Sequence, residues 1–147
     1  EVIATATEAF GPVTLMVNNT GINPVFGPLM DLDLDAARRI VETNCLAALA
    51  WVQKLHADGL AERGGSIVNV ASVAGVRPAP GIAFYGASKA MLIHHTEELA
   101  VELGPTIRVN AVAPGPVWTP LNIADQPAEK VEAFGAKTNL LTSRWSP

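Results

Sequence analysis

Three short apolar runs alternate with two longer stretches in which apolar residues recur at helical spacing. The runs at 13–17, 66–72 and 106–113 are almost continuously apolar, and turn residues follow each of them. Such runs are typical of strands in a parallel sheet, and we expect the first to be buried on both faces. The stretches at 31–56 and 84–103 place an apolar residue every three or four positions, which predicts two long helices.

Capping residues indicate where these helices begin and end. Asp31 or Asp33 is suited to be the N-cap of the first helix, and Gly59 or Gly64 to end it. Gly104, which a proline follows, ends the second helix. Strands that alternate with helices of this length predict right-handed βαβ crossovers, so the fold class is α/β with a parallel sheet.

Shorter helical patterns at 1–11 and 128–136 flank this alternation. We expect residues 1–147 to form a single, incomplete domain, because the sequence opens inside the first of these helices with no strand before it. It also closes at Ser146 and Pro147, which would start a helix. The first strand would then lack a neighbour, and an unpaired apolar edge invites association.

Composition and charge exclude several classes of protein. A hydrophobic content of 49% with 16% charged residues fits a folded, soluble protein of 147 residues. A formal net charge of -4 gives no basic surface for nucleic acid, and the apolar runs are too short to cross a bilayer. We therefore expect no nucleic acid or membrane partner and a cytoplasmic location. The single cysteine, Cys45, excludes an internal disulfide, and we expect no metal site.

Polar or glycine-containing segments follow each predicted strand. They are residues 18–21, Ser72 and residues 114–115. Because ligands of parallel α/β sheets bind outside the carboxyl ends of the strands, we expect these segments to meet in one crevice.

Tyr85 and Lys89 are four residues apart at the start of the second long helix, so their side chains share one face. A nearby ammonium favours phenolate and would lower the pKa of Tyr85, which could then exchange a proton with a substrate oxygen. Ser72 ends a buried strand, where its hydroxyl could bind the same oxygen. Taken singly, these residues would be a packing tyrosine, a solvated lysine and a turn serine.

Asn44 lies in an apolar helical stretch, where asparagine is a poor helix former and a buried amide needs partners. Two interpretations remain open. The residue is a satisfied core amide, or it distorts the helix and holds a water chain that serves Lys89.

Together these residues resemble the short-chain dehydrogenase/reductase superfamily, and most of all its 3-oxoacyl-[acyl-carrier-protein] reductase type. Five motifs carry the resemblance, in order and at consistent spacing: Asn18-Asn19-Thr20-Gly21, Glu42-Thr43-Asn44, Asn69-Val70-Ala71-Ser72, Tyr85-Gly86-Ala87-Ser88-Lys89 and the segment 108–119. Thr20 replaces the alanine that is usual in the family. The resemblance implies a Rossmann-type doubly wound parallel sheet, of which this chain would hold three strands with flanking helices.

The resemblance also implies a role for four residues. Tyr85 would be the general acid in carbonyl reduction and the base in alcohol oxidation, while Ser72 would orient the substrate oxygen. Lys89 would bind the nicotinamide ribose and lower the pKa of Tyr85, and Asn44 would hold the water that relays protons to Lys89. Cofactor contacts would come from Asn19, Gly21, Tyr85, Lys89, Pro114, Gly115, Val117 and Thr119.

The implied cofactor is NADP or NAD. The chain lacks the family's glycine-rich turn, which would receive the pyrophosphate at a helix N-terminus, and it also lacks the residue that reads the ribose 2′ position. We therefore expect the isolated chain to bind cofactor weakly or not at all and to be inactive.

The implied substrate is a small hydrophobic carbonyl or alcohol, because the loop 73–83 and the segment after Thr119 are apolar and rich in proline. An alternative function is that of an inactive fragment that acts only as a dimerising interaction module. Either function favours a homo-oligomer, a dimer or tetramer, through the helices at 31–56 and 84–103. The apolar helix face that fits interior packing or such an interface consists of Ala87, Met91 and His94.

Overall fold

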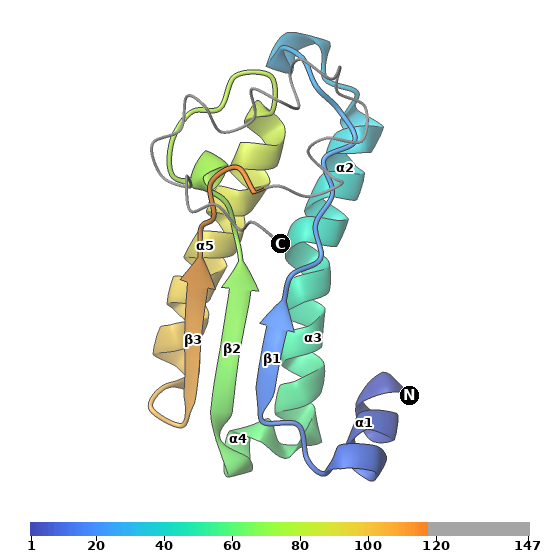
Figure 1. Ribbon diagram of the computed structural model, residues 1–147, viewed down its shortest axis with the longest axis vertical. Helices are drawn as coiled ribbons and strands as arrows, with labels where there is room; N and C mark the ends of the chain where they lie inside the picture. The colour runs from blue at the N-terminus through green and yellow to red at the C-terminus, as the bar shows by residue number, and fades with distance from the viewer. Residues whose placement is uncertain (118–147) are drawn as a thin grey trace, which may run out of the picture. The chain divides into compact units, whose positions relative to one another are not determined.

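The computed structural model describes residues 1–117, and three strands within this range form one parallel sheet. The strands β1 (Leu15–Asn18), β2 (Gly65–Val70) and β3 (Ile107–Val112) lie in that order across the sheet (Figure 1). Parallel neighbours require crossover connections, and here each crossover contains a helix. The α/β class and the three strands that the sequence predicts are confirmed.

The chain forms two compact units, residues 1–113 and 114–147. Every strand and helix of the described residues belongs to the first unit. Thr119 and the helix expected at 128–136 lie outside the described residues.

The first long helix begins later than Asp31. A short 3-10 helix, η1 (Leu29–Asp31), precedes it, and α2 (Leu34–Val41) follows Asp33. The Asp33 carboxylate accepts hydrogen bonds from the backbone N–H groups of Asp35, at 3.0 Å, and Ala36, at 3.3 Å. Asp33 is therefore the N-cap, since its side chain reaches the free N–H groups of the first turn.

The same helix continues past residue 56 through two wider turns. A π-helical turn, η2 (Glu42–Leu46), joins α2 to α3 (Ala47–Leu55), and a second, η3 (His56–Leu60), joins α3 to α4 (Ala61–Arg63). Gly59, with a φ of 90°, only kinks the chain, whereas Gly64 is the residue at which the helix ends. Of the two glycines that the sequence offered as the end of this helix, Gly64 is therefore confirmed and Gly59 is not.

Two further helices complete the described part. α1 (Val2–Phe10) precedes β1, and α5 (Ala83–Leu103) connects β2 to β3 after a 3-10 turn, η4 (Val73–Gly75). Both α-helices agree with the helical patterns of the sequence. Within residues 1–117, none of the helices is both long enough and apolar enough to cross a bilayer.

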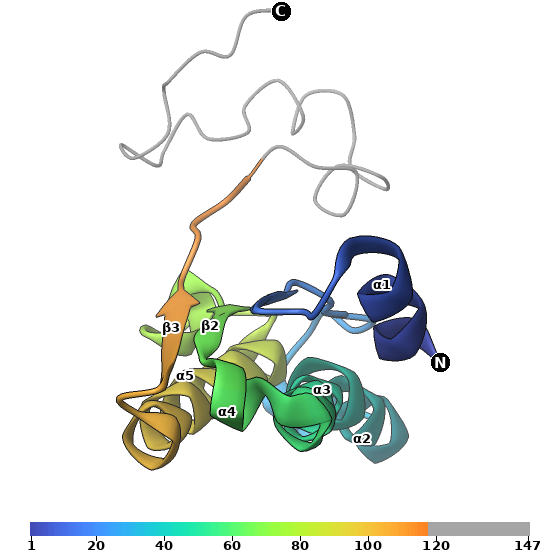
Figure 2. The same ribbon diagram turned by 90° about the horizontal axis from the view of Figure 1, so that it is seen from below.

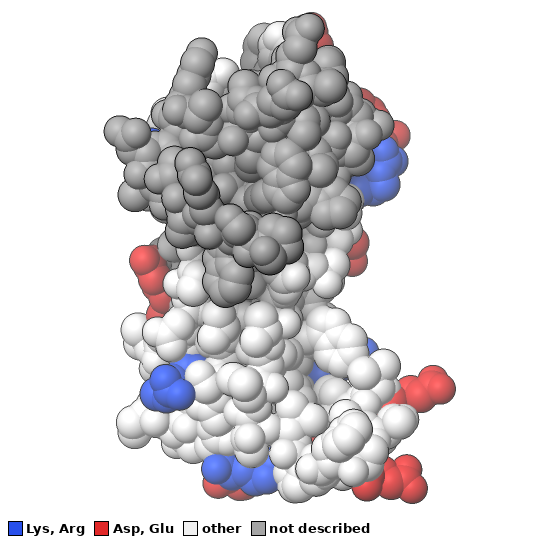
Figure 3. All heavy atoms as spheres, in the orientation of Figure 1, with Lys and Arg blue, Asp and Glu red and all other residues white. Residues whose placement is uncertain are grey.

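The helices α2, α3, α4 and α5 all lie on one side of the sheet (Figure 2). On the opposite face Leu15 is 62% exposed and Val17 is 55% exposed. The prediction that the first strand is buried on both faces is therefore wrong, because β1 pairs only with β2 and no described helix covers this face. In Figure 3, the lower part of this face, over the sheet, carries few charged side chains.

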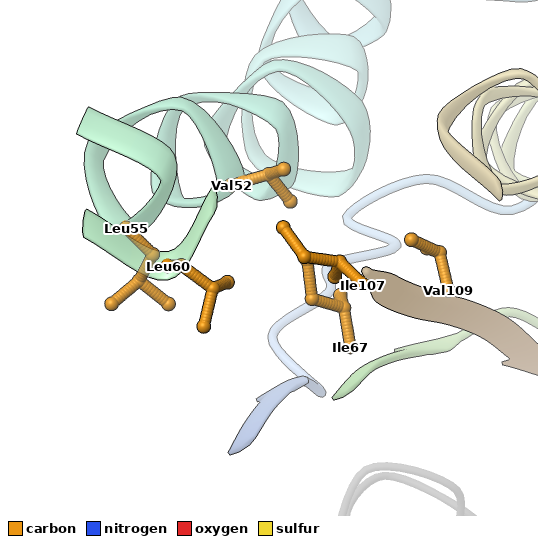
Figure 4. Close-up of a cluster of buried hydrophobic side chains, with 6 residues drawn as sticks. All are labelled: Val52, Leu55, Leu60, Ile67, Ile107 and Val109. Atoms are coloured by element: carbon orange, nitrogen blue, oxygen red, sulfur yellow. The ribbon is translucent and has the colours of Figure 1, made fainter. Parts of the chain in front are cut away.

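The hydrophobic core lies between the sheet and the helices that cover it. Its residues come from α3, from the turn η3 and from two strands (Figure 4): Val52, Leu55, Leu60, Ile67, Ile107 and Val109. Ile67 pairs with Val109 across β2 and β3, so both side chains point to the covered face. Leu99, Ala100 and Leu103 of α5 pack against this cluster, so the core holds both α3 and α5 against the same face of the sheet.

Candidate active site

Two glycines let the loop after β2 approach α5 closely. A Cβ atom added to Gly86 would lie 2.5 Å from the carbonyl oxygen of Ala74, and one added to Gly75 would lie 2.7 Å from the backbone of α5. Neither position can therefore hold a side chain without moving the backbone. This close approach brings Ser72, at the start of the loop, to Tyr85 in the first turn of α5.

Ser72 lies near enough to the Tyr85 phenol for its hydroxyl to lower the pKa of that phenol. Ser72 has extended backbone dihedrals and is also the N-cap of the turn η4, since its hydroxyl oxygen accepts a hydrogen bond of 3.2 Å from the N–H of Ala74. The residue is therefore both a turn serine and a neighbour of the phenol. Because the Ala74 bond uses a lone pair, the hydroxyl proton stays available to an oxygen beside it.

The environment of Tyr85 favours the neutral phenol. The side chain is half-buried, and burial raises the pKa of Tyr85 above its usual value of 10.0, while the nearby Ser72 hydroxyl lowers it in part. The predicted net lowering of this pKa is therefore wrong for this structure, whereas the contribution of Lys89 to it stays a prediction. The Lys89 Nζ atom lies over the face of the Tyr85 ring, 5.7 Å from its centre.

Lys89 is buried, with 3% of its surface exposed, and its ammonium group lies against the end of β2. Its Nζ atom donates a hydrogen bond of 2.8 Å to the carbonyl oxygen of Val70. Burial lowers the pKa of Lys89, and the neighbouring Cys45 thiol partly opposes this by favouring the charged ammonium. Gly21 makes room for the ammonium group, because a Cβ atom there would lie 3.1 Å from Nζ.

Asn44 lies in the π-helical turn η2 and is 1% exposed. Its Oδ1 atom accepts a hydrogen bond of 2.8 Å from the N–H of Ile22. Its Nδ2 group donates to the Ile22 carbonyl oxygen at 3.1 Å and to the Ser88 hydroxyl at 3.0 Å. Both interpretations of Asn44 thus hold in part, because its amide is satisfied and the helix is distorted around it. Its water-holding role stays a prediction.

The remaining predicted cofactor contacts are distributed over both units. Gly21 lies against Lys89 and against Asn44, whose Oδ1 atom would be 3.5 Å from an added Cβ. Asn19 is exposed in the irregular segment directly after β1. The predicted contacts that belong to the second unit are Pro114, Gly115 and Val117, while Thr119 lies outside the described residues.

A hollow of about 480 Å³ lies beside Tyr85. The segment between β1 and α2 forms one part of its lining, and the start of α5 forms the other. The residues that line it are Asn23, Pro24, Val25, Phe26, Gly27, Pro28, Leu29, Asp31, Leu32, Asp33, Gly81, Ile82, Ala83, Phe84 and Tyr85. Most of these side chains are apolar, so the hollow is suited to a compact hydrophobic molecule.

Phe26 and Gly81 join the two parts of this lining. The Gly27 N–H donates a hydrogen bond of 2.9 Å to the Gly81 carbonyl oxygen. The Phe26 ring lies on Gly81, because a Cβ atom there would be only 2.4 Å from the nearest ring atom. Sequence reasoning assigned the substrate contacts to the loop 73–83 and to the segment after Thr119, which lies outside the described residues, and it missed residues 23–33. The irregular, proline-containing composition directly after a strand was the signal that could have indicated them.

Sequence reasoning also gave no role to Ser88. Its hydroxyl lies between Asn44 and the backbone of Tyr85, and the residue is 3% exposed. A serine inside a long helix is a weak helix former, which was the available signal. Nothing in the sequence indicated which residue it meets, because Asn44 lies 44 positions earlier.

The chain matches a family model described as "short chain dehydrogenase" over residues 1–130. It is 36% identical over 118 residues to "Dehydrogenase/reductase SDR family member 4" of Homo sapiens, covering 80% of this chain and 42% of that protein. It is 33% identical over 123 residues to "Tropinone reductase-like 3" of Erythroxylum coca, covering 84% of this chain and 46% of that protein. The chain thus spans less than half the length of these relatives.

Solved structures of dehydrogenases and reductases are also similar to this chain. A 3-oxoacyl-[acyl-carrier protein] reductase from Brucella melitensis superposes with a TM-score of 0.76 at 34% identity, covering 89% of this chain and 51% of that one. An NAD+-bound xylitol dehydrogenase superposes with a TM-score of 0.73 at 35% identity, covering 78% and 44%. Both the sequence and the backbone of this chain are therefore similar to about half of each of these proteins.

Proposed function

The chain belongs to the short-chain dehydrogenase family, and from that premise we propose that it carries the proton-transfer part of an NAD(P)-dependent oxidoreductase. The nicotinamide cofactor supplies or accepts the hydride. Tyr85 donates a proton to the carbonyl oxygen in reduction and removes it from the alcohol in oxidation. The observation that carries the proposal is that Tyr85 lines an apolar hollow with the Ser72 hydroxyl and the Lys89 ammonium group beside its phenol ring.

The protonation state of Tyr85 supports the direction of reduction. A phenol whose pKa is raised by burial is neutral near pH 7 and holds the proton that a developing alkoxide requires. Ser72 keeps its own hydroxyl proton free of the Ala74 contact, so it can donate to the same oxygen. The two hydroxyls would then hold the substrate oxygen from two sides.

The residues around Lys89 fit the ribose of a nicotinamide nucleotide. An ammonium group has three N–H donors, and among the described residues only the Val70 carbonyl oxygen accepts a hydrogen bond from it. The other donors can bind ribose hydroxyls. We further propose that Asn19, Gly21, Pro114, Gly115, Val117 and Thr119 contact the cofactor.

The hollow beside Tyr85 supports a small hydrophobic ketone or alcohol as the substrate. Its volume, about 480 Å³, is in the range of small-molecule pockets. The matched proteins have names as different as tropinone reductase-like, xylitol dehydrogenase and 3-oxoacyl-[acyl-carrier protein] reductase, so their names do not select one substrate.

The outer face of α5 supports self-association. Met91 is 37% exposed and Val101 is 81% exposed, and Ala87 and His94 are exposed on the same helix. We propose that the protein forms a homo-oligomer through this face and the helix pair α2 and α3. A Met91→Glu variant that remains oligomeric in sedimentation would contradict this.

A chimera provides the test of the proposed activity. Residues of this chain replace the matched 118 residues of the human relative, so that the remaining part of the fold comes from a complete protein. We expect reduction of a hydrophobic ketone with NADPH or NADH, and loss of turnover in Tyr85→Phe. A folded chimera without activity, or one that Tyr85→Phe leaves active, would contradict the proposal.

The isolated chain provides a second test. We expect millimolar NADPH or NADH to leave its thermal midpoint unchanged, because the given sequence contains no glycine-rich turn of the kind that would present a helix N-terminus to the pyrophosphate. A clear rise in the midpoint would mean that the part of the site present in this chain binds the nucleotide without that helix.

A further inference from the structure

Ser88 connects the distorted helix to the residue that carries the proposed chemistry. Its hydroxyl donates a hydrogen bond of 2.7 Å to the backbone carbonyl oxygen of Tyr85, and it accepts one of 3.0 Å from the Nδ2 group of Asn44. The residue is buried in α5 with 3% of its surface exposed. No solvent can therefore replace either hydrogen bond without local opening.

The π-helical turn directs two consecutive side chains to Ser88. Asn44 contacts its hydroxyl, and the Cys45 thiol donates a hydrogen bond of 3.2 Å to its backbone carbonyl oxygen. Consecutive side chains of a regular α-helix point about 100° apart, and the wider turn η2 reduces this angle. Asn44 and Cys45 are 1% and 0% exposed, so both are fully inserted between the helices. The distortion thus lies where α2–α3 meets Ser88.

The single proton of the Ser88 hydroxyl fixes the orientation of its neighbours. That proton is directed to the Tyr85 carbonyl oxygen, so a lone pair faces Asn44, and only an N–H group can meet it. The Asn44 carbonyl oxygen must then face the N–H of Ile22, as it does at 2.8 Å. One hydroxyl therefore sets the direction of the Asn44 amide and holds the first turn of α5.

We propose that Ser88 is a positioning residue that ties the backbone of Tyr85 to the Asn44 turn and so keeps the Tyr85 phenol beside Ser72. This inference deepens the proposed function and rests on it for its catalytic meaning. The geometry itself is testable without cofactor or substrate. If the Ser88 hydroxyl only satisfied its own hydrogen bonds within the helix, replacing it would change the stability of the fold but not the pKa of the Tyr85 phenol.

The ionisation of Tyr85 is the measurement that separates these two roles. Tyr85 is the only tyrosine of the chain, so the ultraviolet absorbance of tyrosinate reports on it alone. The variants are Ser72→Ala, Ser88→Ala and the double variant, with Ser66→Ala as the matched control. The Ser66 hydroxyl makes no hydrogen bond within residues 1–117, which is why it is a suitable control. Far-UV circular dichroism at each pH verifies that the chain is folded.

We expect Ser72→Ala to raise the pKa of Tyr85, because it removes the hydroxyl that lowers it. Ser88→Ala should raise the pKa in the same direction by less, and should have no further effect in the Ser72→Ala background. Ser66→Ala should leave it unchanged, and Ser88→Thr, which keeps the hydroxyl, should restore the wild-type value. An unchanged or lowered pKa in Ser88→Ala would overturn the proposal.

If Ser88→Ala does not fold, Ser88→Cys replaces it, since a thiol has nearly the same shape and is a weak donor. Ser88→Cys must then shift the pKa of Tyr85 in the same direction as Ser72→Ala does. The chimera keeps the two proposals apart. If Ser88→Ala raises the pKa of Tyr85 but the chimera is inactive, the positioning role of Ser88 stands and the proposed function is contradicted. If the chimera is active but Ser88→Ala leaves the pKa of Tyr85 unchanged, the proposed function stands and the positioning role is contradicted.

Discussion

Two networks of hydrogen bonds link the region of β1 to α5, and the same kinds of polar group form both. In the strand network, Asn18 donates to Asn69 at 2.8 Å, Asn69 donates to Thr96 at 2.9 Å, and Thr96 donates to the carbonyl oxygen of Leu92 at 2.7 Å. The site network consists of the hydrogen bonds among Ile22, Asn44, Ser88 and Tyr85. In both, a buried amide donates to a hydroxyl, which donates to a carbonyl oxygen of α5.

The two networks differ in what lies beside them. The strand network joins a regular strand to a regular part of α5, and it contains no titratable group. The site network begins in a π-helical turn and ends at Tyr85, which lines the hollow and lies beside Ser72. A buried network whose hydrogen bonds are all made shows that the fold is held in one arrangement. Only the titratable side chain at the end of the site network indicates a catalytic role.

The largest effect is expected from breaking the site network at Asn44. Asn44→Ala removes three hydrogen bonds and leaves the N–H of Ile22 without its partner, so we expect a loss of about 3 kcal/mol in the free energy of unfolding. Urea denaturation measures this. The Cys45 thiol should also react faster with a thiol reagent, because the π-helical turn loosens. A loss below about 1 kcal/mol would mean that the amide is not essential to this turn.

Breaking the strand network should destabilise the fold somewhat less and leave the site unchanged. Asn69→Ala removes two hydrogen bonds from a residue that is 1% exposed, and we expect a loss of about 2 kcal/mol in urea denaturation. The absorbance titration of Tyr85 should be the same as in the wild type. A shifted titration would show that the two networks are coupled and that the distinction between them is wrong.

A variant outside both networks should have a smaller effect. Gly81 has a φ of 82°, and an added Cβ would meet the Phe26 ring, so Gly81→Ala should cost about 1 kcal/mol of unfolding free energy. In a Phe26→Ala background part of this cost should disappear, because the ring is gone while the backbone strain remains. Equal costs in both backgrounds would show that the ring contact does not contribute.

The smallest effect is expected in the pH dependence of stability. The folded pKa of Tyr85 is raised above its ordinary value of 10.0, so the stability that this group contributes is fully present below pH 10. It is lost as the pH rises through the folded pKa. The wild type should therefore lose stability relative to Tyr85→Phe only above pH 10, in urea denaturation at successive pH values. A difference that grows below pH 10 would contradict the direction of the shift.

The sequence by itself determined the elements of this protein and several neighbours in its site. Apolar runs and helical periodicity gave the three strands and the long helices, because both patterns are local properties of the chain. The spacing of Tyr85 and Lys89 placed them on one helix face for the same reason. Turn residues after β2 placed Ser72 near that face, and in the structure its hydroxyl lies near the phenol.

Tertiary structure decided what depends on distant residues. Asp33 rather than Asp31 caps α2, because the chain before it turns once more as η1. Tyr85 has a raised pKa because elements far apart in the sequence bury it, a quantity that spacing alone cannot give. Ser88 meets Asn44 across 44 positions only because the core sets α3 and α5 side by side on one face of the sheet. Local patterns encode where elements form, and packing between elements decides what each side chain meets.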